Sequence, residues 1–249
     1  MSQSKLIARP HTIAILASSL DGRLARADAL GQRIASAYDF QHLEQQVAQV
    51  DAVLFGATTL RLGGTAMRLQ SPHLIAEREH QGRSPQPLQI VCSASGELDF
   101  NLPFFRQPIR RALLTTEKGA SRWQGSTAFD HCWCAGVEEI DWPQAFTHIQ
   151  GASVQTLAVL GGGQLFASLL RIAAIDELWL TLCPLLLGSA APSLYPEEIA
   201  FSGRLTLLNV LPVGNEVYLH YRLNQGSASC SDPSRLMWSS QGDVATQSQ

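Results

Sequence analysis

Three consecutive glycines, set between an apolar stretch and a helically spaced one, constrain this chain more than any other feature. Residues 156–170 read TLAVLGGGQLFASLL, and the run before Gly161, Gly162 and Gly163 has the composition of a buried strand. The apolar residues after the glycines recur at helical spacing and are Leu165, Phe166, Leu169 and Leu170. A strand that turns into a helix through glycines offers free backbone N–H groups, on which a phosphate can sit because no Cβ is in the way. The segment predicts a nucleotide diphosphate site, with a tight turn that only needs positive φ as the alternative.

The composition of the 249 residues fits a domain with a sizeable core and excludes several kinds of partner. Hydrophobic residues make up 45% and charged residues 16%, which leaves little for disordered charged tracts. A net charge of −3 without a Lys/Arg run argues against a nucleic-acid surface. No apolar stretch is long enough to span a bilayer or to act as a secretory signal, so we expect a cytoplasmic protein with no membrane partner.

The five cysteines do not form an even disulfide framework, so reduced thiols are expected. Cys132 and Cys134 lie in a His-Cys-Trp-Cys run, but Cys-x-Cys lacks the usual spacing of a zinc pair and no second pair exists. The sequence therefore predicts no metal site.

Apolar strand-like segments alternate with helical ones up to about residue 183. Strands are expected over residues 11–19, 50–55, 88–92, 112–116, 128–134, 157–160 and 175–183. Ser36 and Asp39 have the form of a capping box at the start of a helix, where a carboxylate commonly stabilises the first turn. Residues 63–87, rich in glycine and proline, are expected to be mainly loop, and residues 145–149 a helical turn.

This alternation predicts an α/β fold with a mostly parallel sheet and helices on both faces. Residues 205–211 and 216–223 should form an antiparallel hairpin at its end. We expect a single domain over residues 1–223, followed by a flexible tail over residues 224–249, which are rich in Ser, Gln and Gly.

Small polar or glycine-containing turns follow three of the expected strands. They begin at Gly56, Ser93 and Gly161. In an open α/β sheet, ligands bind at the carboxyl ends of the strands, so these turns suit an elongated, phosphate-bearing ligand. A dinucleotide is the natural candidate, although the spacing is not that of the Rossmann fingerprint.

Five segments, taken in order, resemble a known family. They are ASSLDGRLA at residues 17–25, VDAVLFGATTLR at 50–61, LQIVCSASG at 88–96, LAVLGGGQLFASLL at 157–170 and IDELWLTLCPLLLG at 175–188. Together they are similar to the dihydrofolate-reductase-like fold, and within it to the riboflavin-biosynthesis pyrimidine reductases, the C-terminal domain of the bifunctional deaminase/reductase. The resemblance covers about residues 11–223. The deaminase motif, His-x-Glu with Pro-Cys-x-x-Cys, is absent from the sequence.

The resemblance implies an NADPH-dependent reductase like 5-amino-6-(5-phosphoribosylamino)uracil reductase, which transfers hydride to the opened ribose of its substrate. It assigns the cofactor's diphosphate to Gly161, Gly162, Gly163, Gln164, Leu165 and Phe166. Thr59 and Ser18 would also lie near the cofactor, and Ser19 near the substrate. Asp21, the aspartate of the Ser-Leu-Asp-Gly motif, would act in catalysis or order its loop. The family is often dimeric, which implies a homodimer.

Three positions depart from the family pattern. Ile15 replaces a lysine, Leu160 replaces the glutamate before the glycines, and Gly63 begins the segment that replaces Asp-x-Pro. The cofactor half of the pattern is retained, so two functions stay open: the reductase, and a dinucleotide-binding paralogue with another small carbonyl substrate or no catalysis. A true folate reductase is a weaker third possibility, with Asp39 as the nearest acid on the first helix.

Several single residues allow two interpretations. Asp21 precedes glycine, and Asp-Gly is a common turn pair whose carboxylate binds the local backbone. Ser93 would contact an adenosine 2′-phosphate or form a plain turn. Arg61 and Arg68 would neutralise a substrate phosphate or lie on the surface.

Overall fold

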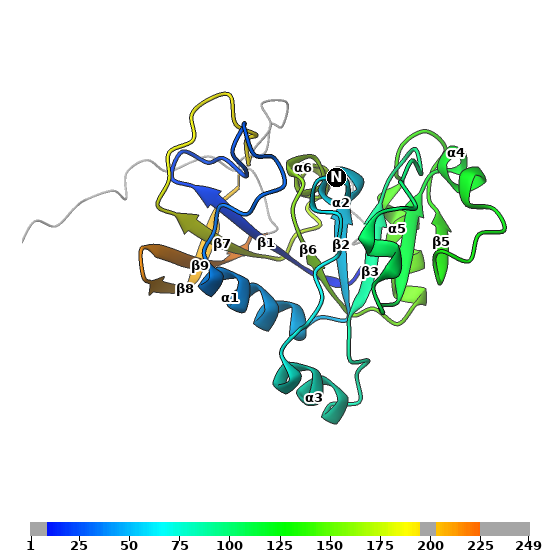
Figure 1. Cartoon of the computed structure of the whole chain (residues 1–249), viewed down its shortest axis with the longest axis horizontal. Coiled ribbons are helices and arrows are strands. Elements are labelled where there is room, and N and C mark those ends of the chain that lie inside the picture. The colour runs from blue at the N-terminus through cyan, green and yellow to red at the C-terminus, as the bar shows by residue number, and fades with distance from the viewer. Residues whose placement is uncertain (1–8, 195–202, 225–249) are drawn as a thin grey trace, which may run out of the picture.

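A sheet of nine strands forms the centre of the protein, in the order β5-β4-β3-β2-β6-β1-β7-β9-β8 (Figure 1). The computed structural model describes residues 9–194 and 203–224. The strands are β1 (His11–Ser19), β2 (Ala52–Gly56), β3 (Leu88–Cys92), β4 (Arg111–Thr115), β5 (His131–Cys134), β6 (Thr156–Val159), β7 (Glu177–Cys183), β8 (Leu205–Val213) and β9 (Glu216–Leu223). Strands β1 to β7 pair in parallel, whereas β9 pairs antiparallel with both β7 and β8.

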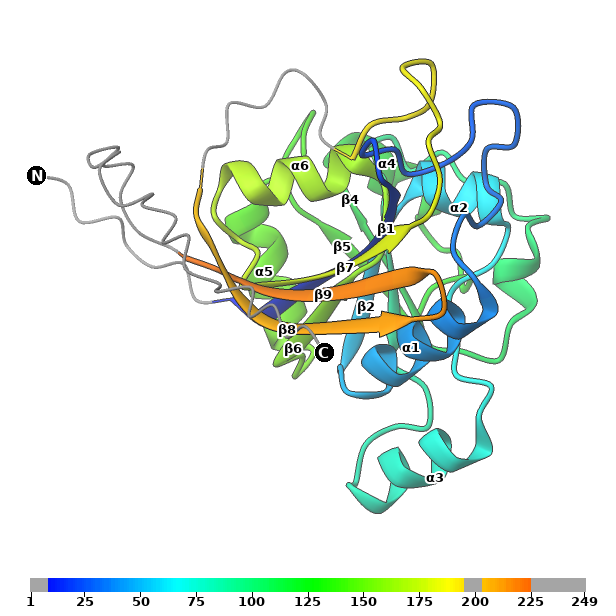
Figure 2. The ribbon, with the colours of Figure 1, turned by 90° about the vertical axis from the view of Figure 1, so that its left-hand side faces the viewer.

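Helices cover both faces of this sheet (Figure 2). They are α1 (Ala37–Ala48), α2 (Ala57–Gly63), α3 (Pro72–His80), α4 (Glu117–Ala120), α5 (Trp142–Gly151) and α6 (Gly163–Arg171). None of the helices in residues 9–194 and 203–224 has the length and hydrophobicity that crossing a bilayer requires. The predicted α/β class, the mostly parallel sheet and the C-terminal hairpin are confirmed.

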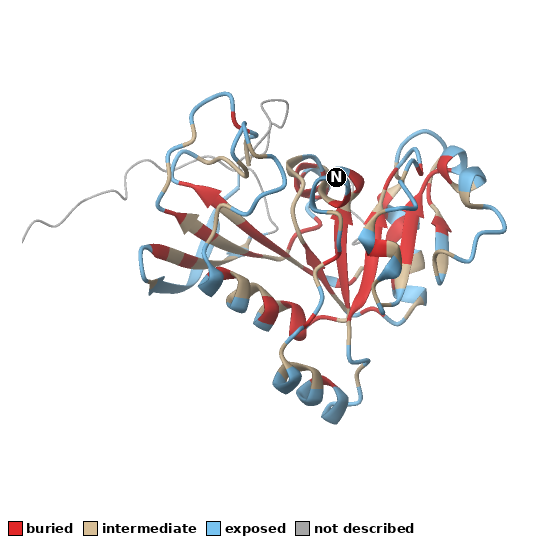
Figure 3. Cartoon of the chain, in the orientation of Figure 1, coloured by how far each residue is buried: buried red, intermediate tan, exposed pale blue. Residues whose placement is uncertain are grey.

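Two hydrophobic cores lie on opposite faces of the sheet. One packs α5 and α6 against the strands and includes Phe146 and Leu169. The other lies on the side of α1 and includes Val47, Leu60 and Phe104. Buried residues are concentrated in the central strands (Figure 3). Because both faces of these parallel strands are covered, their sequences are nearly continuous apolar runs.

The expectation that residues 63–87 are mainly loop was wrong over α3. This helix carries few apolar residues, so its sequence lacks the periodic apolar stripe that would have revealed it. The buried guanidinium of Arg78 attaches it to the body by donating to the carbonyls of Ala48 and Val50, each at 2.7 Å. The polar anchor replaces the usual apolar face.

The helical turn expected over residues 145–149 is the middle of a longer helix, α5. Its N-cap is Asp141, whose carboxylate accepts the backbone N–H of Gln144 at 2.9 Å. Pro143 lies in the first turn, where its missing N–H costs nothing. An aspartate followed two residues later by proline is a helix-start signal, and it places the start of α5 at residue 142.

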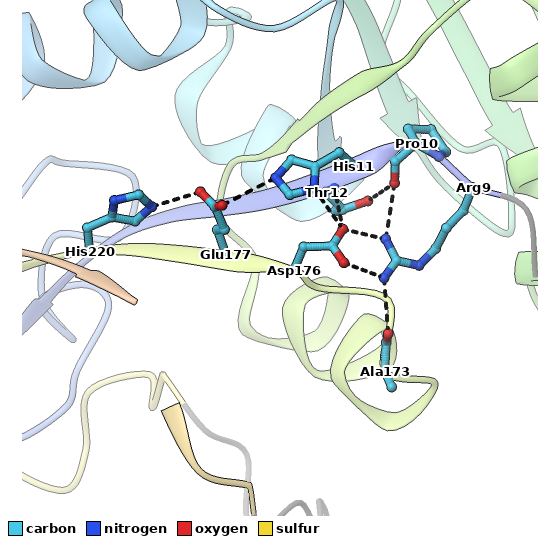
Figure 4. A network of polar contacts seen from close by, with 8 residues as sticks. All are labelled: Arg9, Pro10, His11, Thr12, Ala173, Asp176, Glu177 and His220. Carbon is cyan, nitrogen blue, oxygen red and sulfur yellow. Dashed lines mark hydrogen bonds and ion pairs between the residues drawn. The ribbon is translucent and has the colours of Figure 1, made fainter. Parts of the chain in front are cut away.

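A polar network joins the amino ends of β1 and β7 (Figure 4). Asp176, just before β7, accepts two hydrogen bonds from Arg9 at 2.6 and 2.7 Å. The same carboxylate accepts the backbone N–H of Thr12 at 2.8 Å. The adjacent Glu177 lies 2.8 Å from Nε2 of His220 on β9. Three neighbouring strands are therefore tied together at the edge opposite to the turns that follow β1, β2 and β6.

Candidate active site

A cavity of about 1030 Å³ lies at the carboxyl ends of β1, β2 and β6. Its walls come from the β1–α1 loop, the start of α1, helix α2, the segment after α2, and the 3-10 helix η1 (Pro103–Arg106) with the residues that follow it. Gly161, Gly162 and Gly163 form the part of the wall that leads into α6. The carboxyl edge of a parallel sheet is where α/β proteins bind ligands, so this cavity is the candidate active site.

The glycine turn has the backbone conformation that the sequence required. Gly161 and Gly162 have φ of +72° and +83°, a region that L-residues with a side chain rarely adopt. Gly162 is the N-cap of α6, and no side chain caps this helix, so the N–H groups of its first turn are not bound by a capping oxygen. Gly163 has a different reason to be glycine: a Cβ there would lie 3.0 Å from the carbonyl oxygen of Ser193.

Thr59, on α2, lies directly beside this turn. A Cβ built on Gly162 would be 3.4 Å from the Thr59 hydroxyl, and one built on Gly161 would be 3.9 Å from it. Thr59 also lines the cavity. The structure thus brings together Thr59 and the glycines that the sequence assigned to one cofactor.

The other residues that the sequence assigned to the cofactor do not line the described cavity. Leu165 and Phe166 are 7% and 4% exposed and pack into the core, so their side chains anchor α6 while their backbone belongs to its first turn. Gln164 is exposed on that turn. Ser18 is buried at the end of β1, and Ser93 is buried at the end of β3.

Asp21 holds a loop in place. Its carboxylate accepts the Ser19 hydroxyl and the backbone N–H groups of Leu187 and Gly188, the last at 2.7 Å. The hydrogen bond from Ser19, followed by the one from Leu187, lowers the pKa of Asp21 to about 2. Neither Ser19 nor Asp21 is among the cavity-lining residues that the structure describes. These contacts fit the loop-ordering role that the sequence left open; a catalytic role stays a prediction.

Of the two arginines that the sequence offered as phosphate partners, only one lies at the cavity. Arg61 is exposed and donates to the carbonyl of Glu97 and the hydroxyl of Thr58, at 3.3 and 3.2 Å. It does not line the described cavity, whereas Arg68 does. Arg106, on η1, joins Arg68 in the wall and was not considered in the sequence. Neither Arg68 nor Arg106 forms an ion pair with any residue in the described ranges.

The positions that depart from the family pattern all face the cavity. Ile15, Leu160 and Gly63 are part of its lining, together with apolar side chains such as Phe55 and Leu43. None of the three residues supplies a charge to the cavity wall.

One acid of the cavity was missed as a site residue. Asp39 lines the cavity and is paired there with Arg33 and Thr181. The sequence favoured a helix-start carboxylate for Asp39 over an acid in a cleft, because nothing in the local pattern says which way the first turn of α1 faces.

Residues 9–194 and 203–224 contain no group of three His, Cys, Asp or Glu side chains that could hold a metal ion.

Fold and site together define an α/β protein with a large cavity at the carboxyl edge of a mostly parallel sheet. The glycine turn at the start of α6 forms part of the wall of this cavity. Residues 10–219 match the RibD C-terminal domain family. The chain belongs to this family. The resemblance to the riboflavin pyrimidine reductases is confirmed.

Named relatives agree with this membership. The chain is 23% identical over 219 residues to a 2,5-diamino-6-ribosylamino-4(3H)-pyrimidinone 5′-phosphate reductase of Archaeoglobus fulgidus, covering 87% of this chain and 100% of the relative. It is 24% identical over 218 residues to the riboflavin biosynthesis protein RibD of Escherichia coli, covering 85% of this chain and 59% of RibD. A pyrimidine reductase-like protein of Corynebacterium diphtheriae superimposes with a TM-score of 0.77 at 20% identity, over 87% of this chain and 93% of that one. These relatives indicate an oxidoreductase.

Proposed function

We propose that the protein is an NADPH-dependent reductase of a phosphoribosylaminopyrimidine, related in activity to 5-amino-6-(5-phosphoribosylamino)uracil reductase. The observation that carries the proposal is the glycine turn, with Thr59 beside it, in the wall of a cavity of about 1030 Å³ in a RibD C-terminal domain fold. When bound, NADPH supplies a hydride to the anomeric carbon of the opened ribose. The heteroatom doubly bonded to that carbon takes up a proton, and a ribityl chain results.

The cofactor's diphosphate fits the turn at the start of α6. Because Gly161 and Gly162 have no Cβ, no side chain of the turn covers its backbone beside Thr59. Uncapped N–H groups of a helix N-terminus stabilise a negative charge through both hydrogen bonds and the helix dipole. We assign Gln164 and the backbone of Leu165 to the same contact, with Ser18 near the nicotinamide and Ser93 near the 2′-phosphate.

We assign the substrate's phosphate to the two arginines of the cavity wall that form no ion pair in the described residues. They are Arg68 and Arg106. A guanidinium can donate two parallel N–H bonds to phosphate oxygens, so either side chain suits this group. Arg61, which lies outside the lining, would contribute only if it left Thr58. Apolar residues between these arginines and the glycine turn, such as Phe55 and Leu160, would keep water from the reacting carbon.

Consumption of NADPH in the presence of the phosphoribosylaminopyrimidine tests the proposal. We expect loss of the reduced-nicotinamide absorbance together with a ribitylamino product identified by mass spectrometry. Arg68→Ala should raise KM for the phosphorylated substrate more than it changes the Kd of NADPH. Absence of turnover with either the diaminopyrimidinone or the aminouracil ring, in a protein that binds NADPH, would contradict the proposal.

The apolar wall favours a second candidate function. With Ile15, Leu160 and Gly63 in the lining, a polar sugar finds fewer charged partners than the family pattern provides. A dinucleotide-binding paralogue that accepts another small carbonyl compound, or that has no catalytic activity, would fit this wall. Calorimetry would then show NADPH binding while no phosphoribosylaminopyrimidine is reduced.

We also propose a homodimer formed through the edge strand β8. Its apolar side chains are exposed to between 38% and 49%, namely Leu205, Leu207, Leu208, Val210 and Leu211. An antiparallel edge strand can pair with its own copy across a two-fold axis, which covers both its backbone and its side chains. Leu207→Lys should shift the mass measured by sedimentation to that of a monomer. Leu186→Lys, at a 76% exposed leucine outside the sheet, is the matched control and should not.

A further inference from the structure

An extended segment between α2 and α3 forms one side of the cavity. It covers residues 64–71 and supplies Met67, Arg68 and Gln70, among others, to the lining. Because this segment belongs to neither a helix nor a strand, its backbone N–H and C=O groups need partners other than those of a regular ladder. Three side chains from other parts of the chain provide them, and these side chains determine where the backbone of Arg68 lies.

Two glutamines bind the segment in the way that a neighbouring strand would. The amide of Gln107 accepts the backbone N–H of Ala66 at 2.8 Å and donates to its carbonyl at 3.2 Å. The amide of Gln86 does the same for Leu69, at 2.8 and 2.9 Å. Because each amide binds both the N–H and the C=O of one residue, it fixes the direction of the backbone there as well as its position.

A carboxylate completes the set at the end of the segment. Glu44, on α1, is 7% exposed, and its Oε1 accepts the backbone N–H groups of Gln70 and of Ser71, the latter at 2.7 Å. The segment is therefore fixed at residue 66 and again at residues 69–71. Arg68 lies between these points, so its backbone is held from both sides.

Gln107 also connects this segment to the second arginine of the cavity wall. It directly follows Arg106, in the bend after η1. Arg111, on β4, holds that bend by donating to the carbonyl of Phe105, at 3.3 Å, and to the carbonyl of Gln107. The side chain of Gln107 thus joins the backbone next to Arg106 to the backbone two residues before Arg68.

We propose that Gln107 is a positioning residue, which sets the separation of Arg68 and Arg106 so that both guanidinium groups reach one phosphate. This inference rests on the proposed function, which assigns the substrate's phosphate to these two arginines. Both side chains are long and exposed, so the points at which their backbones are held decide what they reach together. Two guanidinium groups on one phosphate form several charge-assisted hydrogen bonds, and displacement of either group removes some of them. Gln107 acts without touching the phosphate, because its amide oxygen and nitrogen are bound to Ala66.

The test measures binding of D-ribitol 5-phosphate, which has no pyrimidine ring and no bond left to reduce. Its Kd is determined by phosphorus NMR in saturating NADP⁺, so that the probe does not occupy the glycine turn. Gln107→Met keeps the length of the side chain and removes both hydrogen bonds to Ala66. It should raise the Kd of the probe about three- to tenfold and leave the Kd of NADP⁺ unchanged. Arg106→Ala should raise the Kd of the probe at least about tenfold.

A double-mutant cycle separates positioning from general loosening. If Gln107 acts through the two arginines, Gln107→Met should add nothing to the Kd of the probe once Arg106→Ala has removed one of them. Gln86→Met is the matched control, because it loses the same pair of hydrogen bonds to the same segment, at a residue outside the cavity lining. Arg68 stays held from both sides in this control, by Gln107 and Glu44, so the Kd should stay within about twofold of the wild-type value. Thermal melting confirms that each variant is folded.

Three results would each overturn the role of Gln107. They are an unchanged Kd in folded Gln107→Met, an effect that adds in full to that of Arg106→Ala, and an equal loss of affinity in Gln86→Met.

Failure of the proposed function would look different. If no phosphoribosylaminopyrimidine were reduced while the probe and its variants behaved as expected, the pair of arginines set by Gln107 would stand and the reductase assignment would fall. In a working reductase, Gln107→Met should raise KM for the phosphorylated substrate and leave kcat unchanged. If reduction occurred and neither this KM nor the Kd of the probe changed, the reductase would stand and the role of Gln107 would fall.

Discussion

Replacing Gly162 by aspartate addresses the cofactor turn directly. Gly162 has φ of +83° and is the N-cap of α6. Any side chain must hold this unfavourable backbone conformation, which costs about 1–3 kcal/mol. Its Cβ would lie 3.4 Å from the Thr59 hydroxyl and 3.8 Å from the Leu165 Cβ, which is tight but not a collision. The fold should therefore persist with a lowered melting temperature.

The substitution should also weaken NADPH binding, for a reason separate from its effect on stability. The aspartate would place a carboxylate where the diphosphate meets the backbone, and like charges there would lower affinity well beyond a loss of fit. We expect the Kd of NADPH to rise at least about tenfold, equivalent to about 1.4 kcal/mol. Gly162→Ala separates the effect of backbone strain from the effect of the added charge. It shares the strain but adds no charge, so its Kd for NADPH should lie between those of the wild type and Gly162→Asp.

Gly82→Ala is the matched control. Gly82 has φ of +73°, no atom within 4 Å of a built Cβ, and a position outside the cavity lining. This variant should lose stability to a similar extent while its Kd for NADPH stays at the wild-type value. A folded Gly162→Asp protein that binds NADPH as tightly as the wild type would refute the assignment of the diphosphate to this turn.

Three further predictions concern the cavity and its loops. Gly31→Ala would place a Cβ 2.6 Å from the carbonyl oxygen of Leu62, so the β1–α1 loop must shift; substrate KM should rise several-fold while the Kd of NADPH changes little. Asp21 has a folded-state pKa of about 2, below its ordinary value of 3.8, so its stabilising effect is complete above pH 3.8 and lost as the pH falls through about 2. Melting temperatures of the wild type and Asp21→Asn should therefore converge between pH 5 and pH 2, and a constant difference would contradict this role. Ile15→Lys combined with Leu160→Glu should increase turnover of the phosphoribosylaminopyrimidine, measured by NADPH consumption, and no increase in a folded double variant would argue that these side chains do not reach the sugar.

Much of the fold could be predicted because the sheet is covered on both faces. The strands before Gly56, Ser93 and Gly161 are short apolar runs ending in small residues, and such runs are distinctive in a parallel sheet. Helix α3 could not be predicted because a buried arginine, rather than an apolar stripe, holds it. Propensity and periodicity record apolar packing and do not register a guanidinium that reaches back to two carbonyls.

The candidate site divides along a similar line. Residues 161–163 and Thr59 could be assigned because their function depends on the backbone, and a backbone requirement leaves a local mark in the sequence. The partners of Asp39 could not be assigned. Thr181 is 142 residues away along the chain, and its contact with Asp39 exists only because β7 pairs with β1 beneath α1. Only the tertiary structure determines which carboxylate faces the cavity.

The network around Asp176 has a consequence for how the molecule fluctuates. β1 and β7 are parallel neighbours, so no tight turn sets their alignment, and a slip by one residue would invert every side chain. Asp176 sets it instead, by binding Arg9 and the backbone of Thr12 at the amino ends of the two strands. The same alignment places Ala17 beside Thr181 at the far end. Amide protons along both strands should therefore exchange with solvent together, as one cooperative unit, so that the shape of the cavity floor depends on an ion pair at the other end of the sheet.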